Sequence, residues 1–347
     1  MIPSCKGGGL GRQGARMKIL VTGGSGFIGK HLAARLARTD HTVRCLVRSP
    51  ERGALLTNFG VELALGDVTR PETLTEALRG MDCVIHLANV YTMWTPKPEE
   101  MWRVNVEGTR NLMEAAAQAG VGKVVYVSTV AVYGQPADKP FHEDSAPGPK
   151  FFSTYARTKA EGDRIAWEYY HQRGLPLTVL YPGIVLGAGD DKASGEYIMD
   201  VIRRRVPSTI YHRSYATYVY VGDVVEAILR AAENPASVGR KYLIGKTIMN
   251  GKDYAAMIGA AADVRLPLIP FPDFVVTAAA YLQTWAAKVT HQPPRWGLSI
   301  DAAKTLKNGF AFDGSRAERE LGLRYTPIRQ ALAEAVTWYR ERWAAGE

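Results

Sequence analysis

The stretch ILVTGGSGFIG, residues 19–29, places four glycines between an apolar strand and a helical segment. Small residues at Gly23, Gly24, Gly26 and Gly29 let the backbone approach a pyrophosphate, and free N–H groups at the start of the following helix favour an anion. This context predicts a dinucleotide-binding loop. A plain turn between a strand and a helix is the alternative interpretation of the same glycines.

Strand-like apolar runs alternate with helical segments through the first half of the chain. The predicted strands are KILVTG, TVRCLVR, VELALGD, DCVIHLA, KVVYVST and LTVLYPG. The predicted helices cover residues 29–38, 51–58, 71–79, 99–119 and 153–172. This alternation is typical of an α/β fold with a doubly wound parallel Rossmann sheet.

The alternation weakens after about residue 183, and residues 183–217 look irregular. A strand, YVYVGD, and a helix, VVEAILRAAEN, then return to the main body, and from about residue 246 the chain looks helical. We therefore expect a dinucleotide-binding domain over residues 17–245 and a smaller, mostly helical substrate-binding lobe over 246–347. Residues 183–217 should contribute to that lobe, which should cover the carboxyl ends of the strands.

Residues 1–16 are rich in glycine and carry Lys6, Arg12 and Arg16 without an acid. We expect a disordered leader, or a start at Met17. The net charge of +9 suits an anionic cofactor. Nucleic-acid binding is not expected, because the basic residues are dispersed and no nucleic-acid motif is present.

The three cysteines, Cys5, Cys45 and Cys83, lack the spacing of a metal site or a disulfide framework. They favour a reducing, cytoplasmic location without a metal. No run reaches the ~18 apolar residues of a transmembrane helix. For the largely apolar segment 274–289 we expect a buried or cavity-covering helix, with a membrane-surface helix as the alternative. The sequence leaves open whether the chain forms a homodimer.

The residue that follows the second strand bears on the choice of nucleotide. NAD-preferring proteins carry an acid there, which binds the ribose hydroxyls. This chain has Arg48 instead, with Ser49 and Arg52 nearby. A guanidinium pairs with a 2′-phosphate, so we expect NADP, with NAD as the alternative. The competing interpretation makes Arg48 an ordinary surface residue.

Two further strand ends carry polar residues. Asp67 could accept a hydrogen bond from the adenine amine, or it could cap the helix that follows. His86 is expected to be a packed strand-end residue rather than an acid or a base.

Tyr155 and Lys159 are four residues apart on a predicted helix, so they share one face. A nearby ammonium favours the phenolate and lowers the pKa of a tyrosine, which allows proton exchange with an alcohol or a carbonyl. Thr129, at the end of the fifth strand, offers a hydroxyl to the same oxygen. The spacing alone would also fit a surface pair.

The motifs TGGSGFIG, HLA, VNVEGTRNL, VSTVAVYG, YARTK and YPGIVLGAGD resemble the extended short-chain dehydrogenase/reductases, or epimerase/dehydratase family, over roughly residues 17–230. The resemblance implies a catalytic triad of Thr129, Tyr155 and Lys159, with Tyr155 as the acid/base. It also implies that Asn105 fixes the helix and loop near the cofactor. The cofactor-binding residues are expected to be Gly23, Gly26, Phe27, Ile28, Gly29, Arg48, Asp67, Val68, Leu87, Ala88, Tyr155, Lys159 and Pro182.

Departures from the family pattern narrow the expected reaction. Sugar-nucleotide dehydratases carry an Asp-Glu pair where this chain has Val130 and Ala131. The sugar and diphosphate contacts of the epimerases are replaced by Tyr181, Ile184, Leu186, Ala216 and Thr217.

Aromatic residues are frequent near the expected pocket, although each alone is more typical of packing. They are Tyr91, Trp94, Phe151, Phe152, Tyr181 and Tyr211. As a set they favour an apolar or ring-shaped substrate and resemble the dihydroflavonol-reductase and 3-hydroxysteroid-dehydrogenase branches. The expected activity is NADP-dependent hydride transfer between the nicotinamide and a secondary alcohol or ketone of an apolar small molecule. A nucleotide-sugar epimerase and a non-catalytic NADP sensor are the alternatives.

Replacement of Arg48 with Asp should weaken the use of NADPH and spare or improve the use of NADH. A carboxylate repels the 2′-phosphate and can accept hydrogen bonds from ribose hydroxyls. Steady-state kinetics with both cofactors measure this preference. An unchanged preference would remove Arg48 from the cofactor site.

Overall fold

A computed structural model describes residues 16–206, 210–266 and 271–344. Its centre is a seven-stranded sheet in which all neighbouring strands are parallel, in the order β3-β2-β1-β4-β5-β6-β9. The strands are β1 (Lys18–Thr22), β2 (Thr42–Val47), β3 (Glu62–Leu65), β4 (Cys83–His86), β5 (Lys123–Val127), β6 (Leu177–Pro182) and β9 (Lys241–Ile244). The strand order reverses between β1 and β4, and this reversal creates the crevice where such sheets bind ligands.

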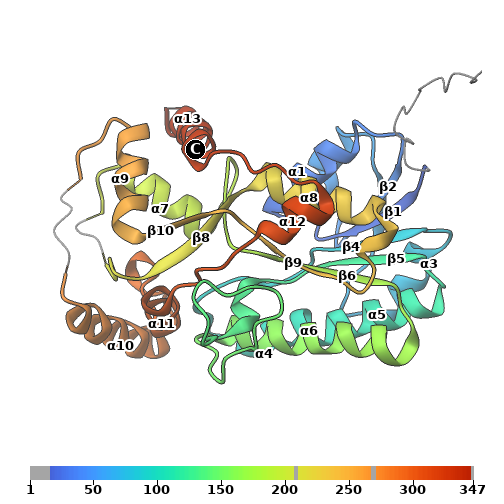
Figure 1. The fold of residues 1–347 in the computed structure, drawn as a ribbon, viewed down its shortest axis with the longest axis horizontal. Helices are drawn as coiled ribbons and strands as arrows, with labels where there is room; N and C mark the ends of the chain where they lie inside the picture. The colour runs from blue at the N-terminus through green and yellow to red at the C-terminus, as the bar shows by residue number, and fades with distance from the viewer. Residues whose placement is uncertain (1–15, 207–209, 267–270, 345–347) are drawn as a thin grey trace, which may run out of the picture.

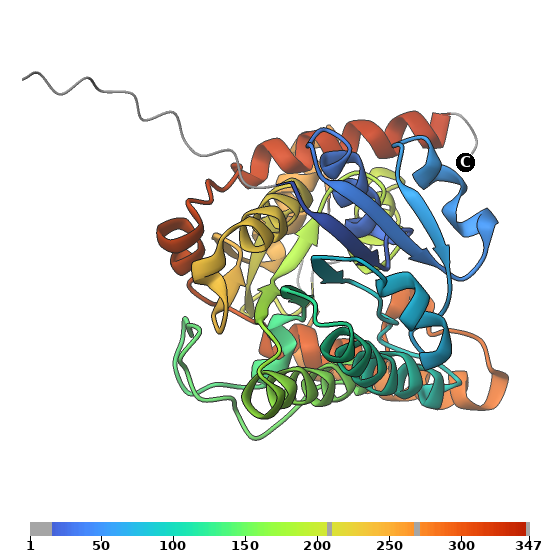
Figure 2. The same cartoon turned by 90° about the vertical axis from the view of Figure 1, so that its right-hand side faces the viewer.

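Helices cover both faces of this sheet, because alternate strand residues point to opposite faces. Ile19 and Val21 of β1 pack into one core, and Leu20 packs into the other. The first core includes α1 (Phe27–Leu36), α2 (Pro50–Thr57), α8 (Val221–Glu233) and α12 (Ser315–Leu321). The second includes α3 (Leu74–Leu78), α5 (Gly108–Gln118) and α6 (Thr154–Arg173). Figures 1 and 2 show α5 and α6 side by side on their face, and the predicted doubly wound α/β fold is confirmed.

All six predicted strands are present, and the predicted helices begin or end within a few residues of the observed ones. The segment expected as one helix over 99–119 consists of α4 (Pro98–Trp102), a π-helical turn η2 (Arg103–Glu107) and α5. The seventh strand, β9, was not predicted. It has four residues, too few to show a clear periodicity.

A second, smaller sheet extends beyond the carboxyl ends of the large one, with β8 between β7 and β10. Its strands are β7 (Ile184–Leu186), β8 (Tyr215–Tyr220) and β10 (Thr247–Asn250). The smaller lobe also contains α7 (Ala193–Ile202), α9 (Gly251–Ala261), α10 (Asp273–Thr290), α11 (Ile300–Asn308) and α13 (Ile328–Ala344). Three sequence interpretations were therefore wrong. The strand YVYVGD, expected in the main body, forms part of β8 in the smaller sheet. Residues 183–217 hold regular elements, and β10 interrupts the region expected to be helical, because strands of three or four residues leave little pattern.

The chain after residue 246 does not stay in the smaller lobe. Helix α12 packs against β9 of the large sheet and against α8, which covers that sheet. Helix α13 then packs against α7 and α9 of the smaller lobe. The expected boundary between the two domains, at residues 245 and 246, stays a prediction. Of the predicted leader, residues 1–16, only Arg16 lies within the described residues.

The chemistry of the buried side chains agrees with an ordinary core. Cys45 and Cys83 are buried free thiols, and burial raises the pKa of each to about 12. Within the described residues no group of three or more potential metal ligands occurs, and no helix is long and apolar enough to cross a membrane. The segment 274–289 forms most of α10, which buries only one face, so it is not fully buried; a cavity-covering role stays a prediction.

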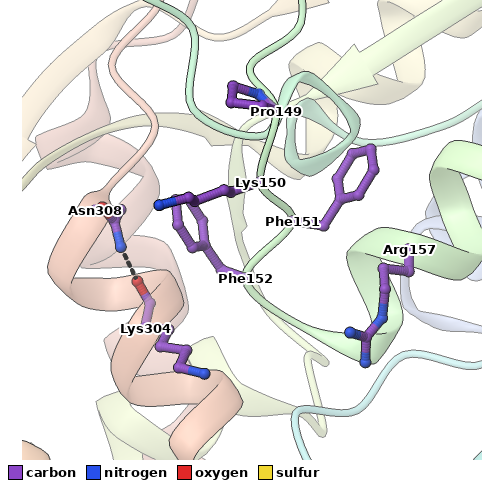
Figure 3. Close-up of a pocket in the computed structure, with 7 residues that line it drawn as sticks. All are labelled: Pro149, Lys150, Phe151, Phe152, Arg157, Lys304 and Asn308. Carbon is purple, nitrogen blue, oxygen red and sulfur yellow. Dashed lines mark hydrogen bonds between the residues drawn. The ribbon is translucent and has the colours of Figure 1, made fainter.

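Helix α11 joins the smaller lobe to the start of α6. The hydroxyl of Ser299 donates to the carbonyl of Met93 at 2.6 Å, and the Asp301 carboxylate accepts the backbone N–H of Thr154 at 2.8 Å. Beside this junction lies an open depression, shown in Figure 3. It is lined by Pro149, Lys150, Phe151, Phe152, Arg157, Lys304 and Asn308.

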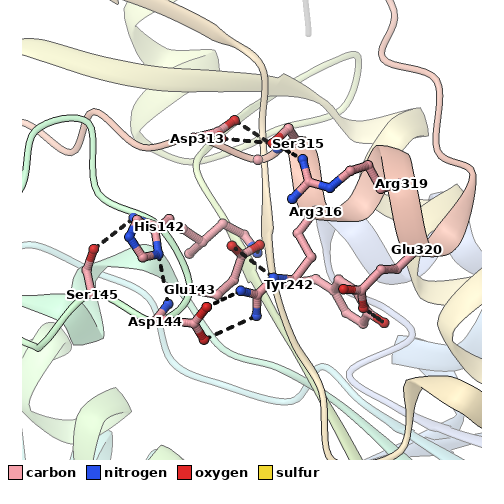
Figure 4. Close-up of polar contacts among 12 residues, drawn as sticks. His142, Glu143, Asp144, Ser145, Tyr242, Asp313, Ser315, Arg316, Arg319 and Glu320 are labelled. Carbon is pink, nitrogen blue, oxygen red and sulfur yellow. Dashed lines mark hydrogen bonds and ion pairs between the residues drawn. The ribbon is translucent and has the colours of Figure 1, made fainter.

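Arg316 of α12 ties the returning chain to the loop that follows β5 (Figure 4). Its guanidinium pairs with Asp144 and lies 3.5 Å from Glu143, whose side chain is only 3% exposed. Burial raises the pKa of Glu143, and the carboxylate also accepts the backbone N–H of Leu243 in β9 at 3.0 Å. Arg316 therefore provides the nearby positive charge that a buried carboxylate needs.

Replacement of Arg316 with Gln should lower the free energy of unfolding by about 1–3 kcal/mol, because Glu143 would stay buried without a counter-charge. Urea denaturation measures the loss. The matched control is Arg319→Gln on the same helix, since Arg319 is exposed, donates to the Ser315 hydroxyl and forms no ion pair with a described residue. That change should cost less than about 0.5 kcal/mol. Equal losses for the two variants would contradict this role of Arg316.

Candidate active site

The glycine-rich loop lies directly against the carboxyl end of β4. Gly23 has a φ of +74°, and a Cβ atom there would come within 2.6 Å of the backbone nitrogen of Ala88. A Cβ atom at Gly29 would lie 2.2 Å from the carbonyl oxygen of Gly23. Both positions therefore require glycine, and the turn brings the start of α1 over the edge of the sheet.

The first turn of α1 is suited to an anion. Gly26, at the N-cap position, provides no side-chain acceptor, and the first turn contains no acidic residue. The N–H groups of this turn therefore have no side-chain cap, and the helix dipole adds a partial positive charge. Phe27, Ile28 and Gly29 lie in this turn, as expected for a pyrophosphate site. The residues present fit a dinucleotide.

Two of the residues expected near the adenosine lie at the ends of β2 and β3. Arg48 directly follows β2, is exposed, and forms no ion pair with any described residue. Asp67 follows β3, and its Oδ1 accepts hydrogen bonds from the N–H and hydroxyl of Thr69. Asp67 therefore organises its own turn and does not cap the following helix, whose N-cap residue is Arg70. Its contact with the adenine stays a prediction.

The remaining expected cofactor residues surround the same crevice. Val68 is buried against Gly108, where a Cβ would lie 2.7 Å from its Cγ2. Leu87 is buried, and Ala88 donates its N–H to the Thr22 hydroxyl at 3.3 Å. Pro182 ends β6. These positions lie at the carboxyl ends of β4 and β6 and in the loop after β3, and their contacts with a nucleotide stay predictions.

Tyr155 and Thr129 lie close together. The Tyr155 side chain is only 8% exposed, and the Tyr91 ring packs edge-on against it with 4.8 Å between the ring centroids. Burial and then Tyr91 raise the pKa of Tyr155, whereas a hydrogen bond with Thr129 lowers it. The net direction is upward, so the phenol is protonated at neutral pH.

Lys159 is fully enclosed between α6 and β5. Its ammonium donates to the Tyr126 hydroxyl at 2.9 Å and to the Val127 carbonyl at 3.1 Å, and it lies 4.5 Å from the centre of the Tyr126 ring. Burial lowers the pKa of Lys159 to about 7. We expected Lys159 to lower the pKa of Tyr155. The structure differs, because the ammonium is directed at Tyr126 and Val127 and burial dominates at the phenol.

Asp163, one helical turn after Lys159, was not singled out from the sequence. Its carboxylate accepts a hydrogen bond from the Tyr181 hydroxyl at 3.1 Å, and burial raises its pKa to about 6. Its charge raises the pKa of Lys159, in opposition to burial. The signal was available in the sequence, since position 163 shares the helix face of Tyr155 and Lys159.

His86 and Asn105 are structural, as expected. The His86 ring is bonded at both nitrogens, to the hydroxyls of Thr22 at 2.7 Å and Thr109 at 3.2 Å, and burial lowers its pKa to about 3. Asn105, on the π-helical turn, accepts the Val90 N–H at 2.7 Å and donates to the Thr158 hydroxyl at 3.1 Å. It therefore fixes the loop that carries Tyr91 to α6.

Only one residue of the predicted aromatic group touches Tyr155, and that residue is Tyr91. Trp94 lies in the same loop. Phe151 and Phe152 line the outer depression in Figure 3. Tyr181 is buried in the core, where it bonds Asp163, and Tyr211 packs under α10 beside Thr277. Tyr181 and Tyr211 therefore serve packing rather than a pocket wall.

The smaller lobe approaches the site from the other side. Burial raises the pKa of Tyr91 to about 12, and the carboxylates of Asp190 and Glu196 add to this rise. Asp190 follows β7 and accepts backbone N–H groups of Lys192 and Gly195, so it organises the start of α7. The arrangement brings an acid-lined helix start within electrostatic reach of the Tyr91–Tyr155 pair.

Residues 19–245 match the model of the NAD dependent epimerase/dehydratase family, and the chain belongs to this family. It is an NAD(P)-dependent oxidoreductase of the extended short-chain dehydrogenase/reductase type, as the sequence motifs predicted.

Relatives and solved structures match nearly the whole chain. Sterol demethylase protein B of Methylococcus capsulatus is 30% identical over 94% of this chain and 99% of its own length. A 4-hydroxy-2-methyl-3-oxo-4-farnesyl-3,4-dihydroquinoline-1-oxide ketoreductase of Stigmatella aurantiaca is 29% identical over 88% of this chain and 91% of its own length. The crystal structure of gox2253 is 29% identical, with a TM-score of 0.81, and covers 94% of this chain and 99% of its own.

Replacement of Asp163 with Asn should move the alkaline limb of the kcat/KM profile to lower pH by about one unit. The limb reports loss of the Lys159 proton as pH rises, and without the Asp163 charge that proton is lost earlier. The control is Glu161→Gln, which removes a carboxylate that faces solvent and pairs with Arg164 on the same helix. A limb that stays in place for Asp163→Asn would exclude this electrostatic role.

Proposed function

We propose that this protein is an NADP-dependent oxidoreductase that reduces a ketone of a largely apolar small molecule to a secondary alcohol, or runs the reverse oxidation. The observation that carries this proposal is the buried Tyr155 phenol, held between Thr129 and the Tyr91 ring next to the glycine-rich loop. The Tyr91 ring gives this hydroxyl an apolar neighbour, which suits a carbonyl on an apolar molecule better than one on a sugar.

The roles of the side chains follow from their positions. When bound, the reduced nicotinamide supplies a hydride to the carbonyl carbon. Tyr155 donates its proton to the carbonyl oxygen, and Thr129 stabilises the same oxygen with a hydrogen bond. Tyr155 carries its proton at neutral pH, as any phenol with an ordinary or raised pKa does, so the proton is available for donation to the carbonyl oxygen.

We assign two further residues, Lys159 and Arg48, to contacts with the cofactor. Two of the three N–H bonds of Lys159 have protein acceptors, so we assign the third to the nicotinamide ribose. Arg48 is exposed and free of ion pairs among the described residues, so we assign it to the 2′-phosphate of NADP. NAD is the alternative, and it would leave Arg48 without a role.

Two further observations weigh against a nucleotide-sugar substrate. Thr217 is fully buried, and its hydroxyl is bonded to both the N–H and the carbonyl of Phe312. Ala216 and Tyr181 are also buried. These side chains cannot bind a diphosphate or a sugar hydroxyl unless the core rearranges. The names of the two curated relatives refer to a sterol and to a farnesylated oxo compound, both largely apolar.

The loss of NADPH absorbance with a panel of aryl and steroid ketones tests the proposal. A reductase consumes NADPH in proportion to ketone, and the alcohol appears in equal amount. An epimerase returns the hydride and gives no net change, and a sensor binds NADPH without turnover. Either of these two results would refute the proposed reaction.

Tyr155→Phe should lower kcat by about 10²–10⁴-fold and leave NADPH affinity within about twofold, because only the transferable proton is lost. Turnover and NADPH fluorescence titration measure the two effects. Tyr215→Phe is the matched control, since Tyr215 is 50% exposed and belongs to β8. Near-normal turnover of Tyr155→Phe would show that another group moves the proton.

A further inference from the structure

Helix α10 presents large apolar side chains to solvent along one face. We call this the apolar face of α10, and it consists of Phe274, Tyr281, Leu282, Trp285 and Val289. Phe274 is 75% exposed, Leu282 69% and Trp285 68%. Their spacing places them on one side of the helix. A continuous exposed apolar surface of this kind marks a contact with a partner or a membrane.

The opposite face of α10 holds the polar side chains. The hydroxyl of Thr284 accepts the N–H of Ile300 at 2.8 Å, and Thr277 bonds the Tyr211 hydroxyl at 3.1 Å. Val276, Ala280 and Ala287 are the buried apolar residues of this face, and they are small or medium in size. A surface helix normally turns its large apolar residues inward. Here they face outward, so α10 is not explained by packing in the monomer.

The exposed charges of residues 271–308, which include α10 and α11, are of one sign. In residues 271–308 the exposed charged side chains are Lys288, Arg295, Lys304 and Lys307. None of these four forms an ion pair with a described residue. The two acids of the same segment, Asp273 and Asp301, are only partly exposed, and Asp301 binds the backbone of Thr154. The depression in Figure 3 adds the exposed cations Lys150 and Arg157 beside Lys304.

We propose that the apolar face of α10 docks this protein onto the surface of an anionic phospholipid bilayer. An interfacial helix buries its apolar side chains at the boundary between headgroups and acyl chains, and cations beside it contact the anionic headgroups. Trp285 and Tyr281 belong to the residue types that favour this boundary. A protein partner would need carboxylates to match the surrounding cations, whereas an anionic bilayer supplies that charge at every orientation.

The position of α10 gives this contact a use. Figure 1 shows α10 at the outer edge of the smaller lobe with α11 beside it, and α11 is bonded to Met93 and Thr154. In the sequence, Met93 lies two residues from Tyr91, and Thr154 lies next to Tyr155. Docking would therefore bring the reactive hydroxyl near the bilayer, where an apolar ketone is concentrated. This use rests on the proposed function, whereas the docking itself does not.

Sedimentation with vesicles tests the docking on the full chain. We expect the protein to sediment with vesicles of equimolar phosphatidylcholine and phosphatidylglycerol, and much less with phosphatidylcholine alone. Leu282→Glu combined with Trp285→Glu should lower the bound fraction about tenfold or more, since it removes the apolar contact and adds repulsion. Lys288→Glu with Arg295→Glu should weaken binding and reduce the preference for the anionic lipid.

Leu55→Glu is the matched control, because Leu55 is 58% exposed on α2, far from α10 in the sequence and the fold. It should leave vesicle binding unchanged, and thermal melting checks that all variants fold. No sedimentation of the native chain, or equal loss for Leu55→Glu, would overturn the proposal. A dimer in light scattering that the α10 variants dissociate, without vesicle binding, would assign the face to a second copy and also overturn it.

Vesicle binding and ketone reduction are measured separately, so the two proposals can fail independently. Sedimentation without turnover refutes only the proposed reaction. Turnover of a water-soluble ketone without sedimentation refutes only the docking.

Discussion

The enclosure of the Lys159 ammonium between α6 and β5 is the constraint on which the rest of the site depends. A charge taken out of water requires hydrogen-bond partners, and Tyr126 and Val127 provide them from the strand. These bonds fix the rotation of α6, and with it the direction in which Tyr155 points toward Thr129. The carboxylate of Asp163 compensates part of the desolvation one turn later. The helix, the strand and the Tyr155 hydroxyl are therefore positioned by one buried cation.

The sequence was most informative where a single residue type is required. Gly23 and Gly29 could be recognised because a Cβ would collide with the backbone at both positions. Tyr155 and Lys159 could be paired because helical spacing fixes their common face. By contrast, β9 and β10 were not predicted, because four residues carry little periodicity. Tyr181 was assigned to the pocket but lies in the core, because the sequence does not show which side of the sheet a single strand residue faces. The pKa of Tyr155 could not be predicted from spacing, since it depends on burial and on Tyr91 from another loop.

The two anion contacts that we infer, at the glycine-rich loop and around α10, would differ in kind. At the glycine-rich loop the positive potential comes from backbone N–H groups and the helix dipole, which are fixed in direction and suit one phosphate geometry. Around α10 it comes from long, flexible side chains, which suit many headgroup positions and none in particular. The first arrangement selects a ligand, whereas the second only favours a surface. The net charge of +9 counts only ionisable side chains, so it does not include the backbone potential at the glycine-rich loop.

The route of the chain between the two sheets has a consequence for recombination among relatives. Residues 17–182 lie in the large sheet and its helices without interruption, so one crossover after Pro182 would exchange that whole unit. The smaller lobe has no such boundary. Its pieces are separated by α8 and β9, and again by α12, all of which pack on the large sheet. Exchanging that lobe between two relatives therefore needs several simultaneous crossovers, whereas the unit that ends at Pro182 needs one.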